Sequence, residues 1–192
     1  MKTIKILSGV LLAILAISCS SDDSKPAPTY PVENPLESYY TQTGFTTTSN
    51  FIDSGNYEFG LAFSPNVKGV MKAITVKLPA ANPTLKVTIW DYTTKEVLKT
   101  ETINVASANT LVSFPITDFA LEKDKKYMIT MNSNDWYKRS KADNTNVTYP
   151  ITAGNIKFLE YRWIGGATQT FPTNVSANYN AGDLSFDFKR TE

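Results

Sequence analysis

The sequence contains no histidine, and this absence limits its chemistry more than any other feature. Histidine is the usual general base near neutral pH and the side chain that most often binds a metal ion. A Ser-His-Asp nucleophile and a zinc site of the usual histidine type are therefore both excluded. Any catalysis by this chain would have to rely on carboxylates.

Cysteine is almost as scarce, because Cys19 is the only one among 192 residues. It follows a leader in which Lys2 and Lys5 precede an apolar run over residues 6–17. This run is shorter than the roughly 20 apolar residues of a membrane-spanning helix. The pattern is typical of a bacterial lipoprotein signal peptide over residues 1–18, with Cys19 acylated by palmitate-type chains as the mature N-terminus. The folded part would then have no thiol for a disulfide, a thiolate metal site or a nucleophile.

Neither sign of charge is in excess, since 19 lysines and arginines face 18 acidic residues. Without the predicted leader, which holds two of the lysines, the mature chain stays close to neutral. Nucleic-acid binding usually needs a clustered basic face, so we expect no nucleic-acid partner. A basic amphipathic helix is also missing from the pattern, so we expect contact with the membrane through the N-terminal lipid alone.

The segment after Cys19 is polar and rich in proline, with prolines at 26, 28, 31 and 35. Such a composition favours an extended chain, so we expect a tether over residues 19–36 and a folded domain over 37–192. The motif Cys19-Ser20-Ser21-Asp22-Asp23 resembles the export signal of surface-displayed lipoproteins of the Bacteroidota. The resemblance implies a lipoprotein of the outer membrane that faces the cell exterior. An ordinary tether facing the periplasm is the alternative.

From about Tyr57 onward, apolar and polar residues alternate with a period of two, as in half-buried strands. The clearest runs lie at residues 74–78, 85–89, 127–131 and 184–188, with turn residues between them. A sustained apolar period of 3.6 residues is not visible, so helix should be scarce. These features predict an all-β fold, a single antiparallel β-sandwich of Ig-like or jelly-roll type with long loops and little helix.

Residues 59–63 and 67–70 form a predicted opening hairpin, and further motifs lie at residues 89–90, 114–116 and 171–186. Together these segments resemble an uncharacterised family of extracellular bacterial β-sandwich domains. The shared motifs are turn glycines and core apolar positions, so the resemblance implies a fold and no catalytic residue. Such domains are similar in architecture to carbohydrate-binding modules, which is a likeness of fold alone.

Aromatic residues are the main candidates for a binding site. Flat rings bind the apolar faces of pyranose rings, while amide and charged side chains bind the sugar hydroxyls. Residues 132–139 combine both kinds of side chain just after a predicted strand, where we expect a loop. We therefore predict a glycan site with Asn134, Trp136, Tyr137, Arg139 and Trp163. The alternative is that Trp136 or Tyr137 folds back onto the edge of the sandwich.

Strand parity gives two further expectations. Trp90 points away from the apolar face of its strand, so it is either an exposed platform or, as we expect, covered by residues 39–51. In the run from 156 to 163, Trp163 lies on one face and Glu160 and Arg162 lie on the other. This charged pair could bind a polar ligand, but such pairs are more often solvated surface decoration.

No cofactor is expected. Calcium is conceivable at two oxygen-rich clusters, but neither has the spacing of a known calcium loop, and such an ion would be structural. The first cluster comprises Asn132, Asn134 and Asp135, and the second comprises Asp143 and Asn144.

Catalysis would require a pair of carboxylates of the glycosidase type. Asp53, Glu58, Asp91 and Glu160 are candidates, but their spacing singles out no pair. We therefore expect a non-catalytic, lipid-anchored module of the cell envelope that binds a glycan or polysaccharide. A structural or adhesive surface protein that binds another envelope protein is the alternative, and a small glycan hydrolase is disfavoured.

Overall fold

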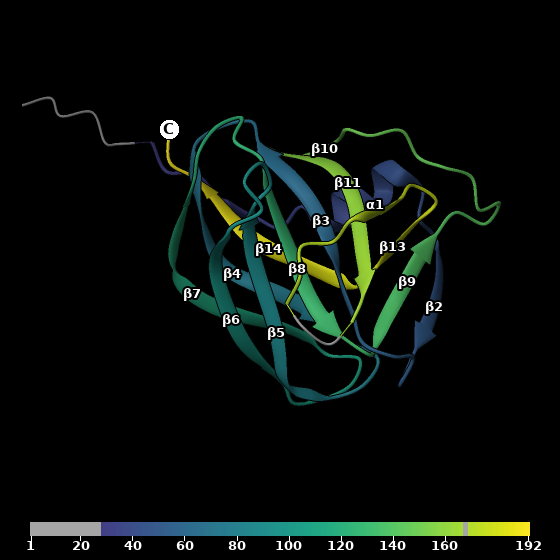
Figure 1. Ribbon diagram of the computed structural model, residues 1–192. Helices are drawn as coiled ribbons and strands as arrows, with labels where there is room; N and C mark the ends of the chain where they lie inside the picture. Colours follow the sequence, from purple (N-terminus) through teal and green to yellow (C-terminus); the bar gives the residue numbers. More distant parts are fainter. Residues whose placement is uncertain (1–27, 167–168) are drawn as a thin grey trace, which may run out of the picture.

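The computed structural model describes residues 28–166 and 169–192, which form antiparallel β-sheets and one helix (Figure 1). The predicted leader, Cys19 and the first part of the predicted tether lie outside these residues. Within the described ranges, no helix combines the length and hydropathy that crossing a membrane requires.

Two sheets pack face to face and form a sandwich. The smaller sheet has the order β1 (Val32–Glu33), β14 (Asp183–Arg190), β4 (Gly69–Lys77) and β7 (Leu111–Leu121). The larger sheet has the order β10 (Ile151–Ala153), β11 (Ile156–Gly165), β3 (Tyr57–Pro65), β8 (Tyr127–Ser133), β5 (Asn82–Asp91) and β6 (Val97–Val105), and β12 (Asn174–Ser176) pairs with β11.

The strand pairing has the topology of a jelly roll. β1 pairs with β14, β3 with β8, β4 with β7 and β5 with β6, and these pairs alternate between the two sheets. Such nesting of early strands with late strands is how an eight-stranded jelly roll forms its two sheets. The predicted antiparallel β-sandwich is therefore confirmed, and the pairing identifies the jelly roll among the two types that the sequence allowed.

Two insertions into the jelly roll build a third sheet. Between β1 and β3 the chain adds α1 (Leu36–Thr43) and β2 (Thr47–Phe51), and between β8 and β14 it adds β9 (Trp136–Ser140) through β13 (Tyr179–Ala181). β2 and β13 pair with opposite edges of β9. In Figure 1 this three-stranded sheet lies beside β11, on the side away from β6 and β7.

The core lies between the two large sheets and follows the predicted alternation. Leu85, Val87 and Ile89 of β5 are fully buried, and so is Phe186 of β14. The ring centroid of Phe186 lies 4.6 Å from that of Phe63 in β3, which brings the two sheets into direct contact. Burial of these apolar side chains supplies the main favourable term in folding.

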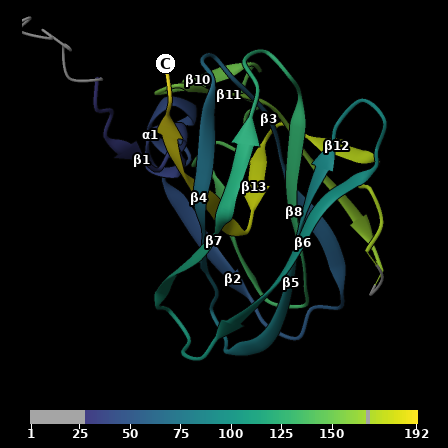
Figure 2. The same ribbon diagram turned by 90° about the vertical axis from the view of Figure 1, so that its left-hand side faces the viewer.

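The chain before β3 also packs onto the sandwich, although its sequence shows no strand alternation. Tyr39 of α1 is fully buried, its ring centroid lies 4.8 Å from that of Phe158, and its hydroxyl lies 2.6 Å from that of Tyr149. Val32 of β1 pairs with Lys189, so contacts of the fold begin within the segment predicted as tether. Figure 2 shows α1 and β1 beside β14, near the C-terminus.

Gly182, between β13 and β14, should tolerate alanine poorly, because both its backbone conformation and its neighbours oppose a side chain. Its φ is +87°, and a Cβ there would lie 2.5 Å from Cε of Met131 and 2.7 Å from Cε2 of Phe59. We expect Gly182→Ala to lower the free energy of unfolding by about 1–3 kcal/mol more than Gly55→Ala. Gly55 is the matched control, because its φ is +90° but its nearest contact would be 3.7 Å from Tyr57. Equal losses in urea denaturation of the two variants would contradict the steric explanation.

Candidate functional site

A pocket of about 230 Å³ lies where the three-stranded sheet meets β3 and β11. We call it the aromatic pocket, because seven of its nine lining residues carry an aromatic ring. Lys138 is the one charged residue among the nine. The lining residues are Phe51, Tyr57, Phe59, Trp136, Lys138, Tyr161, Trp163, Tyr179 and Ala181.

Strand parity explains why these side chains converge. Successive side chains of a strand point to opposite faces, so residues two apart share a face. Four strands each contribute such a pair, namely Tyr57 and Phe59 of β3, Trp136 and Lys138 of β9, Tyr161 and Trp163 of β11, and Tyr179 and Ala181 of β13. The walls are therefore mounted on hydrogen-bonded strands rather than on loops.

The rings of the aromatic pocket contact one another. Trp136 is half-buried and stacks on Phe51, with ring centroids 5.4 Å apart and an interplanar angle of 12°. The edges of Tyr57 and Phe59 contact Trp136, each at 5.4 Å. Tyr57 also lies 6.0 Å from Trp163, so it joins the two tryptophans of the pocket. Each ring is held by its neighbours, which fixes the shape of the wall.

Few polar groups accompany the rings. Nε1 of Trp163 donates to Oγ of Ser176 at 3.2 Å, whereas Nε1 of Trp136 has no acceptor within the described part of the chain. Nζ of Lys138 lies 4.5 Å from the centroid of the Tyr179 ring. Burial raises the pKa of Tyr161 well above its usual range, so its phenol stays neutral. Apolar walls with a few oriented polar groups are typical of small-molecule sites.

The structure brings together two of the five residues predicted for the site, Trp136 and Trp163. Tyr137 and Arg139 point to the other face of β9, where the Tyr137 hydroxyl donates to Asn109 and Nε of Arg139 donates to Asp183 at 3.0 Å. Asn134 lies in the turn before β9 and donates its side-chain amide to Oδ1 of Asp53 at 3.1 Å. These three residues therefore lie outside the aromatic pocket.

The prediction that Trp136 lies on a loop is wrong, because residues 136–140 form strand β9. The connection from β8 is only two residues long, and the Ser133 side chain closes it by accepting the backbone N–H of Asp135 at 3.0 Å. β9 then pairs with β2 on one edge and β13 on the other. The polar composition of this segment suggested a loop, but it forms a strand, and its polar side chains bind neighbouring elements.

Sequence reasoning also missed several lining residues, including Phe51, Tyr57, Lys138 and Tyr179. One available signal was the period of two along a strand, since Lys138 is two residues from Trp136 and Tyr57 is two residues from Phe59. For Phe51 and Tyr179 no local signal exists, because they reach the pocket through the pairing of β2 and β13 with β9.

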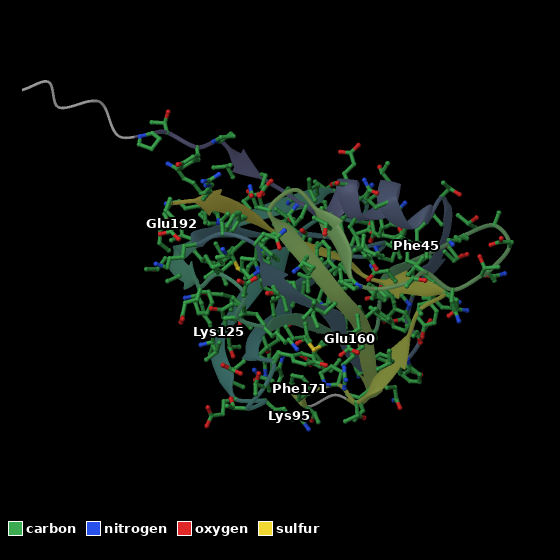
Figure 3. All side chains as sticks on the ribbon, turned by 90° about the horizontal axis from the view of Figure 1, so that it is seen from above. Phe45, Lys95, Lys125, Glu160, Phe171 and Glu192 are labelled. Atoms are coloured by element: carbon green, nitrogen blue, oxygen red, sulfur yellow. The ribbon has the colours of Figure 1, made fainter. Side chains whose placement is uncertain are left out.

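Trp90 is covered, as predicted, but the covering segment differs from the expected one. Its side chain is 4% exposed, and its ring contacts Phe171 at 5.7 Å rather than residues 39–51. Figure 3 shows Phe171 beside Lys95, on the side of the molecule away from α1. Nε1 of Trp90 donates to Oγ1 of Thr130 at 2.8 Å, so this tryptophan is a structural residue.

None of the four candidate carboxylates lines the aromatic pocket. Glu160 accepts hydrogen bonds from Arg162 and from the Tyr92 hydroxyl, so the charged pair on β11 is held internally. The other three are engaged separately: Asp53 with Asn134, Asp91 with the backbone N–H groups of Thr93 and Thr94, and Glu58 with Thr130.

The oxygen-rich clusters bind protein groups. Oδ1 of Asp135 accepts the backbone N–H of Asp53 at 2.9 Å, and Oδ1 of Asp143 accepts that of Thr145 at 3.1 Å. Within residues 28–166 and 169–192, no group of three or more histidine, cysteine or acidic side chains is placed to hold a metal ion.

Glu58 should give stability a distinctive pH dependence. Its side chain is 1% exposed, and burial raises the pKa of this carboxyl although Thr130, Asn132 and Lys86 act in the opposite direction. Ionised Glu58 therefore disfavours folding, and this penalty grows as the pH rises from the ordinary value of 4.5 through the raised pKa. We expect Glu58→Gln, which keeps an oxygen for Thr130, to be more stable than the natural protein at neutral pH.

Urea denaturation of both proteins over a series of pH values measures this difference. The gain of Glu58→Gln should shrink as the pH falls, because the natural carboxyl becomes protonated in the folded state. A gain that stays constant from acid to neutral pH would contradict titration of Glu58 as its cause.

No protein-family model matches the chain, and no curated protein matches it.

Proposed function

We propose that this protein is a non-catalytic, lipid-anchored binding module of the cell envelope that binds a saccharide in the aromatic pocket. One observation carries the proposal: two of the three tryptophans of the chain, with Tyr57 between them, form the walls of one pocket. Its volume of about 230 Å³ lies below the range of about 300–1,000 Å³ that suits drug-sized ligands. A single sugar ring, or the end of a chain, is a ligand of suitable size.

The chemistry of the walls supports a saccharide. The C–H faces of a pyranose pack against flat aromatic rings, and its hydroxyls need a few polar partners at the edges. Trp136 and Lys138 line the pocket, and their Nε1 and Nζ atoms are donors available to such hydroxyls. Because the rings are fixed by strands and by one another, little conformational entropy is lost on binding.

The origin of the pocket within the fold also supports a binding role. Of the four strands that contribute pairs of lining residues, only β3 belongs to the eight strands of the jelly roll. The others, together with β2, come from the two insertions. Function commonly resides in sites that are grafted onto a fold of this kind.

The location is proposed from the sequence. Cys19 would carry the lipid, and the acidic residues that follow it favour the outer surface of the outer membrane over the periplasm. Residues 20–31, if extended at about 3.1 Å per residue, would place the domain roughly 35–40 Å from the bilayer. Protease treatment of intact cells tests the surface location, since a periplasm-facing protein would be protected.

Binding of another envelope protein through an edge strand is less well supported. β7, at one edge of the smaller sheet, contains Pro115, which has no N–H to donate, and a bulge interrupts its pairing with β4. β6, at one edge of the larger sheet, carries the ion pair of Lys99 and Glu101. Proline, bulges and charges are the features by which edge strands resist addition of a further strand.

Tryptophan fluorescence gives a direct test of the proposal. A screen of neutral and acidic glycans identifies a ligand, and titration of the full chain in detergent should then change the emission of Trp136 and Trp163. We expect Trp90→Phe to retain most of this change, because Trp90 lies outside the aromatic pocket. Trp163→Phe should weaken binding severalfold, because the smaller ring offers less contact area and no indole N–H.

Two outcomes would overturn the proposal. One is the absence of any glycan that binds, and the other is a ligand whose affinity is unchanged in both Trp163→Phe and Trp136→Phe.

A further inference from the structure

We propose that Lys138 makes the aromatic pocket selective for an acidic saccharide, in which a pyranose ring carries a carboxylate. This inference rests on the proposed function of the pocket and names the class of saccharide that it binds. The pyranose ring would pack against the aromatic walls, and its carboxylate would pair with the ammonium group of Lys138.

The position of Lys138 is unusual for a lysine. It lies on β9, the central strand of the three-stranded sheet, where it pairs with Ser49 of β2 and Ala181 of β13. Its side chain shares a face with Trp136 and is half-buried among the rings. A lysine with no role here would more commonly extend into solvent, where its ammonium is best hydrated.

The ammonium of Lys138 lacks a counter-charge. Its Nζ lies 4.5 Å from the centroid of the Tyr179 ring, and within the described ranges no carboxylate forms a salt bridge with it. By contrast, Lys72 pairs with Asp118 and Lys99 pairs with Glu101. A cation held over a ring face keeps its hydrogen-bond donors free for a ligand.

The other lining residues of the pocket also favour an anion beside Lys138. No acidic residue lines it, so a bound carboxylate would meet no like charge from its walls. Apolar rings lower the local dielectric, which strengthens the attraction between an ammonium and a carboxylate relative to water. A neutral sugar would leave the ammonium desolvated without this compensation, so the same walls should bind it more weakly.

The test uses the full chain in detergent and matched pairs of ligands. Oligomers of galacturonate, glucuronate and mannuronate are each compared with the carboxyl-reduced form, which keeps the ring and loses the charge. For at least one pair, we expect the acid to bind about tenfold more tightly than its neutral counterpart, with an affinity that falls as salt is added.

Variants assign this preference to Lys138. Lys138→Gln should abolish the tenfold difference, Lys138→Arg should retain it, and Lys72→Gln, which removes a lysine outside the pocket, should leave it unchanged. Equal binding of acid and neutral forms, or a preference that survives in Lys138→Gln, would overturn the inference while the proposed function stands. If neither form of any pair binds, and the wider glycan screen also finds no ligand, both proposals fail.

Discussion

Replacement of Asp183 with alanine is expected to lower the free energy of unfolding by about 3–5 kcal/mol. Asp183 is 5% exposed, and its carboxylate accepts hydrogen bonds from Nε of Arg139 at 3.0 Å and from the hydroxyl of Tyr40 at 2.9 Å. Nη2 of Arg139 donates to the second oxygen. Removal of the carboxylate would leave a partly buried guanidinium without its counter-charge, which costs more than the intact pair contributes.

The effect should extend to the aromatic pocket, because this network joins the third sheet to the sandwich. Asp183 lies on β14, Arg139 on β9 and Tyr40 on α1, and Nη1 of Arg139 reaches Oγ1 of Thr48 on β2 at 2.7 Å. β9 carries Trp136 and Lys138 on its opposite face. Loss of the anchor on one face of β9 should therefore loosen the pocket wall on the other.

Chemical denaturation of Asp183→Ala and Asp118→Ala distinguishes a buried anchor from an ordinary surface pair. Asp118 forms a salt bridge with Lys72 at 2.5 Å, but the side chains of Lys72 and Asp118 are 42% and 51% exposed. Such pairs contribute at most about 1 kcal/mol, so Asp118→Ala should be nearly neutral. Similar losses in the two variants would refute the role of Asp183 as an anchor.

The sandwich was predictable because its strands carry their own signal. Leu85, Val87 and Ile89 lie two residues apart along β5, and all three side chains are buried in the core. The choice between Ig-like and jelly-roll pairing was not predictable, since it depends on contacts such as Val32 with Lys189 across nearly the whole chain. No local pattern of side chains records such a pairing.

The N-terminal helix shows a second limit of local signals. α1 spans only eight residues, which is too short for a stable isolated helix in water. It forms because Tyr39 fills a space against Phe158 and Phe45, and because Gly44 ends it with a φ of +69°. Tertiary packing therefore determines this element.

For the site, the sequence identified the type of residue better than the arrangement. Tryptophans with polar neighbours pointed to Trp136 and Trp163, but the polar neighbours Tyr137 and Arg139 face away from the aromatic pocket. The side chains of a loop follow no regular alternation, whereas successive side chains of a strand point to opposite faces. Recognition of β9 as a strand would have replaced both residues with Lys138.

Trp136→Ala is expected to weaken the proposed saccharide binding and to destabilise the protein, and the two losses have different causes. The half-buried ring packs on Phe51, Tyr57 and Phe59, so its truncation leaves a cavity and should lower the free energy of unfolding by about 2–4 kcal/mol. The same ring forms a wall of the pocket, and its removal should weaken binding at least about thirtyfold, as for a residue at the centre of an interface.

Trp136→Phe separates the two effects, since phenylalanine keeps an aromatic ring beside Phe51 but has no indole N–H and a smaller face. We expect it to recover most of the lost stability in thermal denaturation, while calorimetric titration still shows saccharide affinity severalfold below that of the natural protein. Trp90→Phe is the control, because it makes the same substitution at a tryptophan that lies outside the pocket. If Trp136→Phe and Trp90→Phe changed the affinity equally, Trp136 would be a packing residue, and the aromatic pocket would lose its main binding surface.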